Sequence, residues 1–369
     1  MKIKNIILTI ILSIFYPFSL LQKVNPNKIS FISLESTELT KDFEIVNQEL
    51  VKSGAYELEY ILFNYSQSLR SEFDYVIACI KQLFAINRSH LVLLDFNNFV
   101  VSKFKRKNGV KVLQLWHASG AIKKFGNTVT RDYQIKNYDY TIVNSEFFVA
   151  PFAQAFNIKK ENVKITGIPE TDKLFNGQRI SDNESYFYAK YPQLENKTIV
   201  TYAPTFRGRV GTGFREIEID LDFIQKSLGN EYAIIYKPHP LITNSKYQNN
   251  QNIVYMSEEF IEKIFAITDI LVSDYSAIIY EFLVTKRPII AYVPDLTEYS
   301  SNPGVLFDYD QEFPGAIAKN NQELVDEIRF ISDDDKRREK LYNKVFKYRD
   351  GKSTQRVMTL IENIMLDKL

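Results

Sequence analysis

Short apolar runs alternate with segments of helical length along most of this 369-residue chain. The runs are continuous and rich in β-branched residues, which is typical of parallel strands that are buried on both faces. The predicted strands are 28–33, 75–79, 91–95, 111–116, 140–143 and 163–166, followed by 198–203, 232–236, 252–255, 270–272 and 288–292. The pattern therefore predicts an α/β fold with two doubly wound parallel-sheet domains.

A polar stretch separates the two sets of strands. Residues 176–197 are rich in Asn, Ser, Asp and Tyr and contain a short helical pattern without a core pattern. Two domains of roughly 150 residues each suit this chain length. We expect domains at 25–180 and 181–345, a separate segment at 1–24 and a C-terminal helix at 346–369. The charged helical residues from Asp333 onward are typical of a solvated face.

The N-terminal segment is apolar. Lys2 and Lys4 precede an apolar run at 6–16 that continues past Pro17 to Leu21, without a small-residue cleavage site after it. A run interrupted by Pro17 is short for the roughly 20 residues that span a bilayer. We expect a helix that lies in the membrane interface. A spanning anchor and a helix packed on the protein body are the alternatives.

Composition and missing motifs narrow the function. A formal net charge of +1 gives no indication of nucleic-acid binding. The single Cys79 excludes disulfides and cysteine zinc sites and fits a reducing, cytoplasmic setting. The absence of Gly-x-Gly-x-x-Gly and of the P-loop motif argues against dinucleotide oxidoreductases and P-loop enzymes. No metal-ligand spacing stands out, so we expect no cofactor and no protein-held metal, and a requirement for Mg²⁺ stays open.

Two histidines each follow an apolar run, His117 after Trp116 and His239 within Lys237-Pro238-His239-Pro240. The carboxyl ends of parallel strands are where open α/β sheets bind ligands, so we expect both rings in a cleft between the domains. His117 can act as a general base, or it can be a strand-end histidine that bonds a carbonyl.

The residues around these histidines suit an anion. Ser119 and Gly120 let a substrate approach the backbone, and an expected helix after them would offer N–H groups beside Lys123 and Lys124. The prolines that flank His239 restrict its position. Together with Lys237 this histidine can stabilise charge on a diphosphate leaving group, or the segment can be a structural turn.

Two further segments carry polar groups after predicted strands. Arg207 offers a planar fork of donors for phosphate, and Gly208, Gly211 and Gly213 behind it predict a mobile flap or a plain surface loop. Ser273 or Asp274 is expected to cap a helix whose N–H groups, with the hydroxyls of Ser273 and Ser276, suit phosphate. Glu281 can bond ribose hydroxyls or be an ordinary exposed glutamate.

Taken in order, the Trp-His, Ala-Pro-Thr-Phe-Arg, Lys-Pro-His and Ser-Asp-Tyr-Ser segments resemble the CDP-glycerol glycerophosphotransferase family of teichoic acid synthesis. The resemblance covers roughly residues 85–350. The residues after Trp116 and the lack of a long extra N-terminal domain look more like the priming enzymes than the polymerases. The resemblance implies a GT-B-like architecture with a central cleft, with 25–180 as the acceptor side, 181–345 as the nucleotide-donor side, and a peripheral location at the cytoplasmic face of the membrane.

The resemblance also implies a reaction. Glycerol phosphate passes from CDP-glycerol to a hydroxyl of an undecaprenyl-diphosphate-linked saccharide or a growing chain, and CMP is released. His117 would be the base and His239 would stabilise the diphosphate. The implied substrate-binding residues are Trp116, Ser119, Gly120, Arg207, Lys237, Ser273, Asp274, Ser276 and Glu281. Three positions depart from the usual family pattern: Glu281 replaces Asp, Ala277 replaces Ser and Glu170 replaces Arg.

Other functions remain open at this point. A GT-B glycosyltransferase for capsular or cell-wall polysaccharide would use the same diphosphate grip but release a nucleoside diphosphate. A ribitol phosphate donor is a close variant. A polymer-binding scaffold without catalysis is the third alternative, and a homo-oligomer is compatible with each of them.

Overall fold

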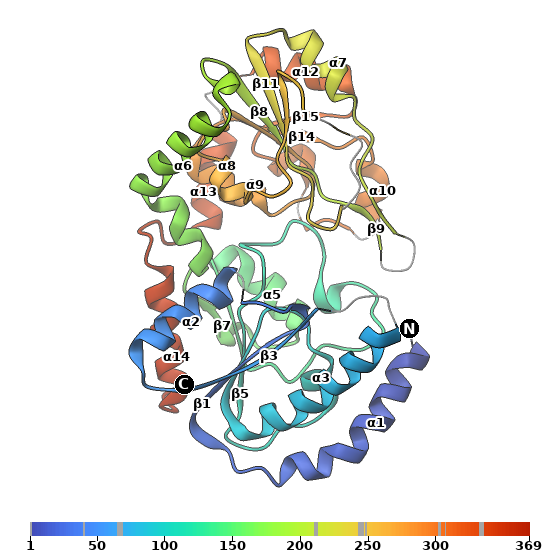
Figure 1. Cartoon of the computed structure of the whole chain (residues 1–369), viewed down its shortest axis with the longest axis vertical. Helices are drawn as coiled ribbons and strands as arrows, with labels where there is room; N and C mark the ends of the chain where they lie inside the picture. The colour runs from blue at the N-terminus through green and yellow to red at the C-terminus, as the bar shows by residue number, and fades with distance from the viewer. Residues whose placement is uncertain are drawn as a thin grey trace. The chain divides into compact units, whose positions relative to one another are not determined.

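The chain forms two compact units (Figure 1). The computed structural model describes residues 2–39, 41–64, 69–209, 213–242, 247, 249–301, 304–306, 308–331 and 336–369. Unit 1 contains Met1–Ser119, Phe125–Asp172 and Phe346–Leu369, and unit 2 contains Gly120–Lys124 and Lys173–Val345. The second half of the chain therefore receives a short segment from the first half, and returns its last residues to unit 1.

Unit 1 is built on a seven-stranded sheet with the order β2-β3-β1-β4-β5-β6-β7. All neighbouring strands are parallel except β2, which pairs antiparallel with β3. The strands are β1 (Asn25–Ser33), β2 (Glu35–Ser36), β3 (Glu57–Asn64), β4 (Ser89–Leu94), β5 (Lys111–Gln114), β6 (Tyr140–Val143) and β7 (Val163–Ile165). Every residue of β4 and β6 is buried, as expected for the middle of a sheet that is covered on both faces.

The C-terminal helix α14 (Ser353–Met365) belongs to the core of unit 1, where it lies beside α2 (Lys41–Ser53) (Figure 1). Its side chains at helical spacing are buried against the sheet; they are Val357, Leu360, Ile361 and Ile364. The expectation of a solvated face is therefore wrong for this helix, because the charged residues alternate with an apolar stripe.

The turn at 167–172, the last part of unit 1 before Lys173, holds the start of α14. The carboxylate of Asp172 accepts hydrogen bonds from the backbone N–H groups of Ser353 and Thr354, both at 2.8 Å. Gly167 has φ +80°, and a Cβ there would lie 2.2 Å from Ser353 Oγ. The turn at 167–172 is thus explained by packing and capping.

The expected strand 75–79 is wrong, because these residues lie inside helix α3 (Leu69–Arg88). Their neighbours extend the apolar run at helical spacing, with Cys79, Leu83 and Ile86 all buried. A run of five apolar residues fits either a strand or a buried helix segment, and the pattern of the flanking residues distinguishes the two. Burial raises the pKa of the Cys79 thiol to about 12, so this cysteine is inert. Sequence patterning missed several of the shortest strands and also β3, which has eight residues and is mostly half-buried.

The remaining helices of unit 1 are short, except for α1. They are α1 (Lys2–Leu20), α4 (Phe99–Lys103) and α5 (Val149–Phe156). Helix α1 packs along α3, as Figure 1 shows.

Unit 2 is built on a six-stranded, fully parallel sheet with the order β12-β11-β8-β13-β14-β15. Its strands are β8 (Thr198–Tyr202), β11 (Tyr232–Tyr236), β12 (Ile253–Tyr255), β13 (Ile270–Ser273), β14 (Ile289–Tyr292) and β15 (Ala316–Ala318). The order of the strands reverses between β8 and β13. In a doubly wound sheet, ligands bind at the carboxyl ends of the strands at such a point.

Helices cover both faces of this sheet. On one face α7 and α12 contribute Leu221, Ile224, Leu324 and Ile328 to the core, and on the other face α6 contributes Phe187 and α8 contributes Ile264. The helices are α6 (Gly177–Lys190), α7 (Leu221–Leu228), α8 (Ile261–Ile264), α9 (Ile278–Phe282), α10 (Leu296–Ser301), α11 (Tyr309–Glu312), α12 (Asn321–Arg329) and α13 (Lys336–Val345). The predicted fold class, α/β with two parallel sheets and an N-terminal apolar helix, is confirmed.

The burial of α14 predicts a stability effect. Ile361→Ala removes a fully buried side chain and leaves a cavity, so the free energy of unfolding should fall by about 2–5 kcal/mol. Urea denaturation followed by circular dichroism measures it. Glu362→Ala, exposed on the same helix, serves as the control, and equal midpoints for the two variants would show that α14 is not part of the core.

Candidate functional site

The turn after β5 carries His117 and is held by Gln114. The Gln114 side chain accepts a hydrogen bond from the backbone N–H of Trp116 at 2.9 Å and donates to the carbonyl of Phe96 at 2.9 Å. Trp116 has φ +65°, a left-handed conformation that is costly for a bulky residue. Strain of this kind persists where the surroundings enforce it, and it clusters at functional sites.

The His117 ring is positioned by aromatic neighbours. It stacks on Phe96 at a centroid distance of 4.1 Å and an interplanar angle of 15°, and its centroid lies 4.0 Å from that of Trp116. Its Nδ1 lies 3.2 Å from the carbonyl oxygen of Asp95. A carbonyl only accepts hydrogen bonds, so Nδ1 carries the proton and the neutral ring has its lone pair on Nε2.

Behind His117 the chain enters unit 2 without forming a helix. The expected helix after Gly120 is wrong, since the next helical element of the described chain is the 3₁₀ turn Gly126–Thr128. Ser119 is buried in unit 1, where its carbonyl accepts a hydrogen bond from the Asn144 amide at 2.7 Å. Gly120 begins the segment that belongs to unit 2.

His239 has the opposite hydrogen-bonding pattern. Its Nδ1 accepts from the backbone N–H of Leu241 at 3.2 Å. The neutral ring therefore carries its proton on Nε2, where it can donate to an anion. The ring forms a T-shaped contact with Phe206, with a centroid distance of 4.7 Å and an interplanar angle of 68°. Phe206 follows β8 and His239 follows β11, so two adjacent strands of unit 2 bring these rings together.

Lys237, at the start of the same segment, is nearly buried. Its Nζ donates to the carbonyl of Ser257 at 2.6 Å. Burial lowers the pKa of Lys237, against the opposing charges of Glu258 and two neighbouring glutamates. An ammonium group has three donors, so the bond to Ser257 leaves Lys237 able to bind an anion as well.

A buried ion pair joins the loops after β8 and β13, where the strand order reverses. Arg207 Nη1 lies 2.9 Å from Asp274 Oδ2, and Asp274 is fully buried. The Asp274 carboxylate also accepts from the backbone N–H and the hydroxyl of Thr205, at 2.8 and 2.9 Å. These bonds fix the backbone of both loops at the expected binding edge.

Arg207 makes a second ion pair with Asp295 at 2.6 Å and lies over the rings of Tyr275 and Tyr299, at 5.1 and 4.9 Å. Burial opposes the charge of Arg207, but the hydrogen bonds that Arg207 donates to Asp295 and the charge of Asp274 outweigh it and raise the pKa of this residue. The guanidinium expected to bind phosphate is thus already committed to two carboxylates.

The helix after β13 begins later than expected. Helix α9 has Ala277 as its N-cap, so the expected caps Ser273 and Asp274 are wrong. The Ser273 hydroxyl donates to the carbonyl of Ala203 at 2.7 Å. Ser276 precedes this short helix and Glu281 lies on it, and both residues are half-buried.

The structure describes part of the segment after Arg207 that was expected to be a flap or a surface loop. Strands β9 (Arg207–Arg209) and β10 (Gly213–Arg215) pair antiparallel, with Gly208 opposite Phe214. Gly211 lies outside the described residues.

Sequence reasoning missed several residues of these clusters. Phe96 and Asp95 support His117, and Asp295 pairs with Arg207, although nothing in the local sequence marks them because they come from other loops. Lys123, noted only as positive charge, lies in unit 2 near Phe206.

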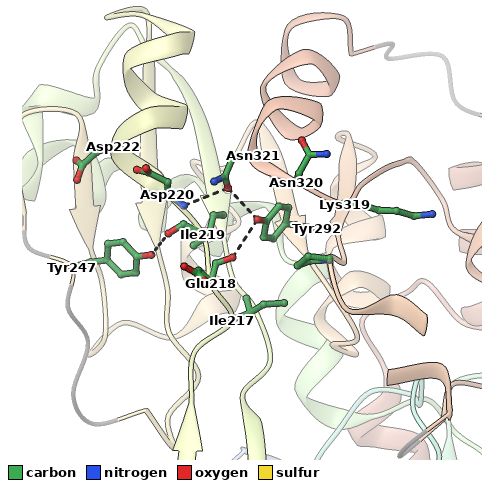
Figure 2. A pocket seen from close by; sticks show the side chains of 11 residues that line it. Ile217, Glu218, Ile219, Asp220, Asp222, Tyr247, Tyr292, Lys319, Asn320 and Asn321 are labelled. Carbon is green, nitrogen blue, oxygen red and sulfur yellow. Dashed lines mark hydrogen bonds between the residues drawn. The ribbon is translucent and has the colours of Figure 1, made fainter. Parts of the chain in front are cut away.

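Unit 2 also has a cavity of about 660 Å³ at the carboxyl ends of β14 and β15 (Figure 2). Tyr292 donates there to the carbonyl of Glu218 at 3.2 Å and lies 3.0 Å from Asn321 Oδ1, and Tyr247 donates to the carbonyl of Ile219 at 2.6 Å. None of the expected site residues lines this cavity.

The Arg207 network predicts a stability effect. Asp274→Asn removes a buried charge and faces an amide toward the guanidinium, so the free energy of unfolding should fall by about 3 kcal/mol. Chemical denaturation measures the loss. Asp310→Asn, at an exposed position of the same unit, should change it by less than about 0.5 kcal/mol. Similar small effects in both variants would mean that the pair does not hold the loops.

Comparisons with known proteins cover most of the chain, including the motif residues described above. The family model for CDP-Glycerol:Poly(glycerophosphate) glycerophosphotransferase matches residues 14–363. A teichoic acid ribitol-phosphate primase of Bacillus spizizenii is 27% identical over 94% of this chain and 94% of its own length. A teichoic acid glycerol-phosphate primase of Bacillus subtilis is 30% identical over 78% of this chain and 77% of its own length.

A solved structure of the wall teichoic acid polymerase TagF, a histidine variant soaked with CDPG, has the same GT-B-like fold. It covers 100% of this chain and 97% of its own, with a TM-score of 0.74 and 20% identity. The resemblance predicted from the ordered motifs is confirmed by the family match. The chain belongs to the CDP-glycerol:poly(glycerophosphate) glycerophosphotransferase family, a group of transferases of teichoic acid synthesis.

Proposed function

We propose that this protein transfers glycerol phosphate from CDP-glycerol to a hydroxyl of a lipid-linked saccharide or a growing teichoic acid chain. The acceptor oxygen attacks the β-phosphorus of CDP-glycerol, the bond from that phosphorus to the bridging oxygen breaks, and CMP leaves. Membership of the family supports the reaction class.

The observation that carries the mechanism is the opposite hydrogen bonding of the two histidines. His117 donates through Nδ1 to the carbonyl of Asp95, so its Nε2 can accept the proton of the attacking hydroxyl. His239 accepts at Nδ1 from the N–H of Leu241, so its Nε2–H can donate to a diphosphate oxygen. One ring is prepared as a base and the other as a hydrogen-bond donor.

The loops of unit 2 support the donor side of this mechanism. Lys237 adds positive charge two residues from His239, while Arg207 and Asp274 hold the two loops at the switch point in place. We assign Ser276 to the phosphates and Glu281 to the ribose. In phosphoryl transfer, positioning and charge stabilisation of this kind supply most of the catalysis. Trp116, Ser119 and Gly120 form the acceptor side next to His117.

The N-terminal helix supports membrane association. Helix α1 is the one described helix that is long and apolar enough to cross a membrane. Its inner face is attached to unit 1: Leu12 is fully buried, the Asn87 amide donates to Ser19 Oγ at 2.9 Å, and Tyr16 donates to the carbonyl of Lys105 at 2.7 Å. Its outer face exposes Ile3, Ile6, Ile7, Ile10, Ile14 and Phe18. A helix bound in this way favours lying in the interface of the inner leaflet over spanning it.

A ribitol phosphate donor is the second candidate. The Bacillus spizizenii relative that matches almost the whole chain is a ribitol-phosphate primase. CDP-ribitol would use the same diphosphate grip, and only the polyol would differ.

Substitution of the two histidines should separate their roles. With CDP-glycerol and a lipid-like acceptor, the wild type should release CMP. His117→Ala should lower the transfer rate by about 10²–10⁴-fold while donor binding persists, because the base is lost. His239→Ala should weaken both donor binding and transfer. Nucleotide release and calorimetric donor affinity measure the two effects.

The outcomes of this experiment discriminate the alternatives. Equal loss of donor affinity in both variants would contradict the division of roles. CMP release from CDP-ribitol but not from CDP-glycerol would show that CDP-ribitol is the donor. Release of a nucleoside diphosphate from a sugar nucleotide would identify a glycosyltransferase. Turnover that neither substitution changes would refute the mechanism.

The outer face of α1 predicts membrane binding. Ile10→Asp combined with Ile14→Asp puts two charges on that face and should lower binding to vesicles with anionic lipid by about tenfold or more, measured by co-sedimentation. Phe330→Asp, at another exposed apolar position, is the matched control. Unchanged binding of the α1 variant would refute an interfacial role for this helix.

A further inference from the structure

The segment Gly120–Lys124 brings a lysine from the first half of the chain into unit 2. Its backbone is anchored there by three hydrogen bonds: Tyr280 donates to the carbonyl of Ala121 at 3.2 Å, Leu306 N to the carbonyl of Ile122 at 2.6 Å, and Lys124 N to the carbonyl of Gly304 at 3.0 Å. Lys123 itself forms an antiparallel bridge with Val305. The position of Lys123 in unit 2 is therefore fixed by its backbone.

The side chain of Lys123 points to the cluster after β8. Its Nζ lies 5.5 Å from the centroid of Phe206, the same ring with which His239 forms a T-shaped contact at 4.7 Å. A cation at this distance from an aromatic ring is held weakly. Phe206 thus has a lysine and a histidine as neighbours, and both can donate hydrogen bonds to an anion.

Lys123 lacks the partner that a partly buried ammonium needs. Among the described residues, no carboxylate, carbonyl or hydroxyl forms a hydrogen bond or ion pair with its Nζ. The carboxylate of Asp274 acts on it electrostatically but is already bonded to Arg207 and Thr205. Burial lowers the pKa of Lys123, Asp274 opposes this effect, and the charge of Arg207 adds to it.

We propose that Lys123 binds the diphosphate of the donor nucleotide together with His239. This inference rests on the proposed function and adds a residue to its donor site. A partly buried ammonium that bonds none of the described residues is unfavourable, and a diphosphate would supply oxygens for the three donors of Lys123. Lys237 differs, because it already donates to the carbonyl of Ser257.

The neighbouring lysine provides a matched control. Lys124 is exposed, whereas Lys123 is partly buried, and Lys123→Met and Lys124→Met remove the same charge one position apart. The experiment measures calorimetric affinity of the full chain for CDP-glycerol and for inorganic diphosphate, and the melting midpoint without ligand. Lys123→Met should weaken binding of both ligands by about 10- to 100-fold, which corresponds to loss of a charged hydrogen bond. Lys124→Met should match the wild type.

The melting midpoint distinguishes ligand binding from a structural role. If Lys123 serves the ligand, Lys123→Met should keep or raise the midpoint, because an unpaired buried charge disappears, and Lys123→Arg should restore most of the affinity. Equal affinities of the two methionine variants would overturn the proposal. So would a fall in midpoint that accompanies the loss of affinity.

The two ligands separate this proposal from the proposed function. If the wild type binds inorganic diphosphate but not CDP-glycerol, the proposed donor is wrong, and the effect of Lys123→Met on diphosphate still decides the role of Lys123. If the wild type binds neither ligand, both proposals are refuted. If it binds both and Lys123→Met changes neither affinity, only the role of Lys123 is refuted.

Discussion

The ion pair between Arg207 and Asp274 is the constraint on which the ligand edge of unit 2 depends. Asp274 is fully buried, and its carboxylate bonds the backbone and side chain of the loop after β8 while it belongs to the loop after β13. Removing Arg207 would leave the buried carboxylate of Asp274 without its counter-charge, and removing Asp274 would leave the Arg207 guanidinium with Asp295 alone. Either loss takes away bonds that hold the two loops in place. The lysines of this edge have the complementary property. Among the described residues, Lys237 and Lys123 retain donors without a hydrogen-bond partner, and these donors are what the proposed binding of a diphosphate uses.

Fixed backbone groups also decide the chemistry of the two histidines. A carbonyl faces Nδ1 of His117, and an N–H faces Nδ1 of His239. Neither group can change its hydrogen-bonding character, so each neutral ring has a defined tautomer. Sequence spacing reveals neither fact. The carbonyl belongs to Asp95 in the loop after β4, and the N–H comes from the residue that follows Pro240. The strained turn at Trp116 and the stacking ring of Phe96 set the orientation of His117.

The sequence predicts the strands well where burial on both faces makes their apolar runs continuous, as in β4, β6 and β13. The prediction fails where the apolar pattern is weak, or where the same run of apolar residues fits both a strand and a helix. The half-buried β3 was missed, and 75–79 was assigned to a strand although α3 continues on both sides. The candidate motif residues could be proposed from the sequence because histidines and glycines after strands are distinctive. Their partners could not be found, because Asp295 and Phe96 meet them only through the fold. The sequence could not predict that Gly120–Lys124 belongs to unit 2 either, because backbone hydrogen bonds to residues near position 305 hold this segment there.

Helix α1 is apolar on two faces. The inner face is covered by α3, and hydrogen bonds at Ser19 and Tyr16 and an ion pair between Lys4 and Glu72 hold it along its length. The outer face keeps its isoleucines in water, although burial of each such side chain is worth about 1.5–3 kcal/mol. Soluble proteins rarely expose a continuous apolar patch without a partner. Under the proposed membrane association, all the inner contacts would be lost if the helix turned upright through a bilayer. The proposal therefore has the outer face reach lipid while α1 stays attached and lies parallel to the membrane surface.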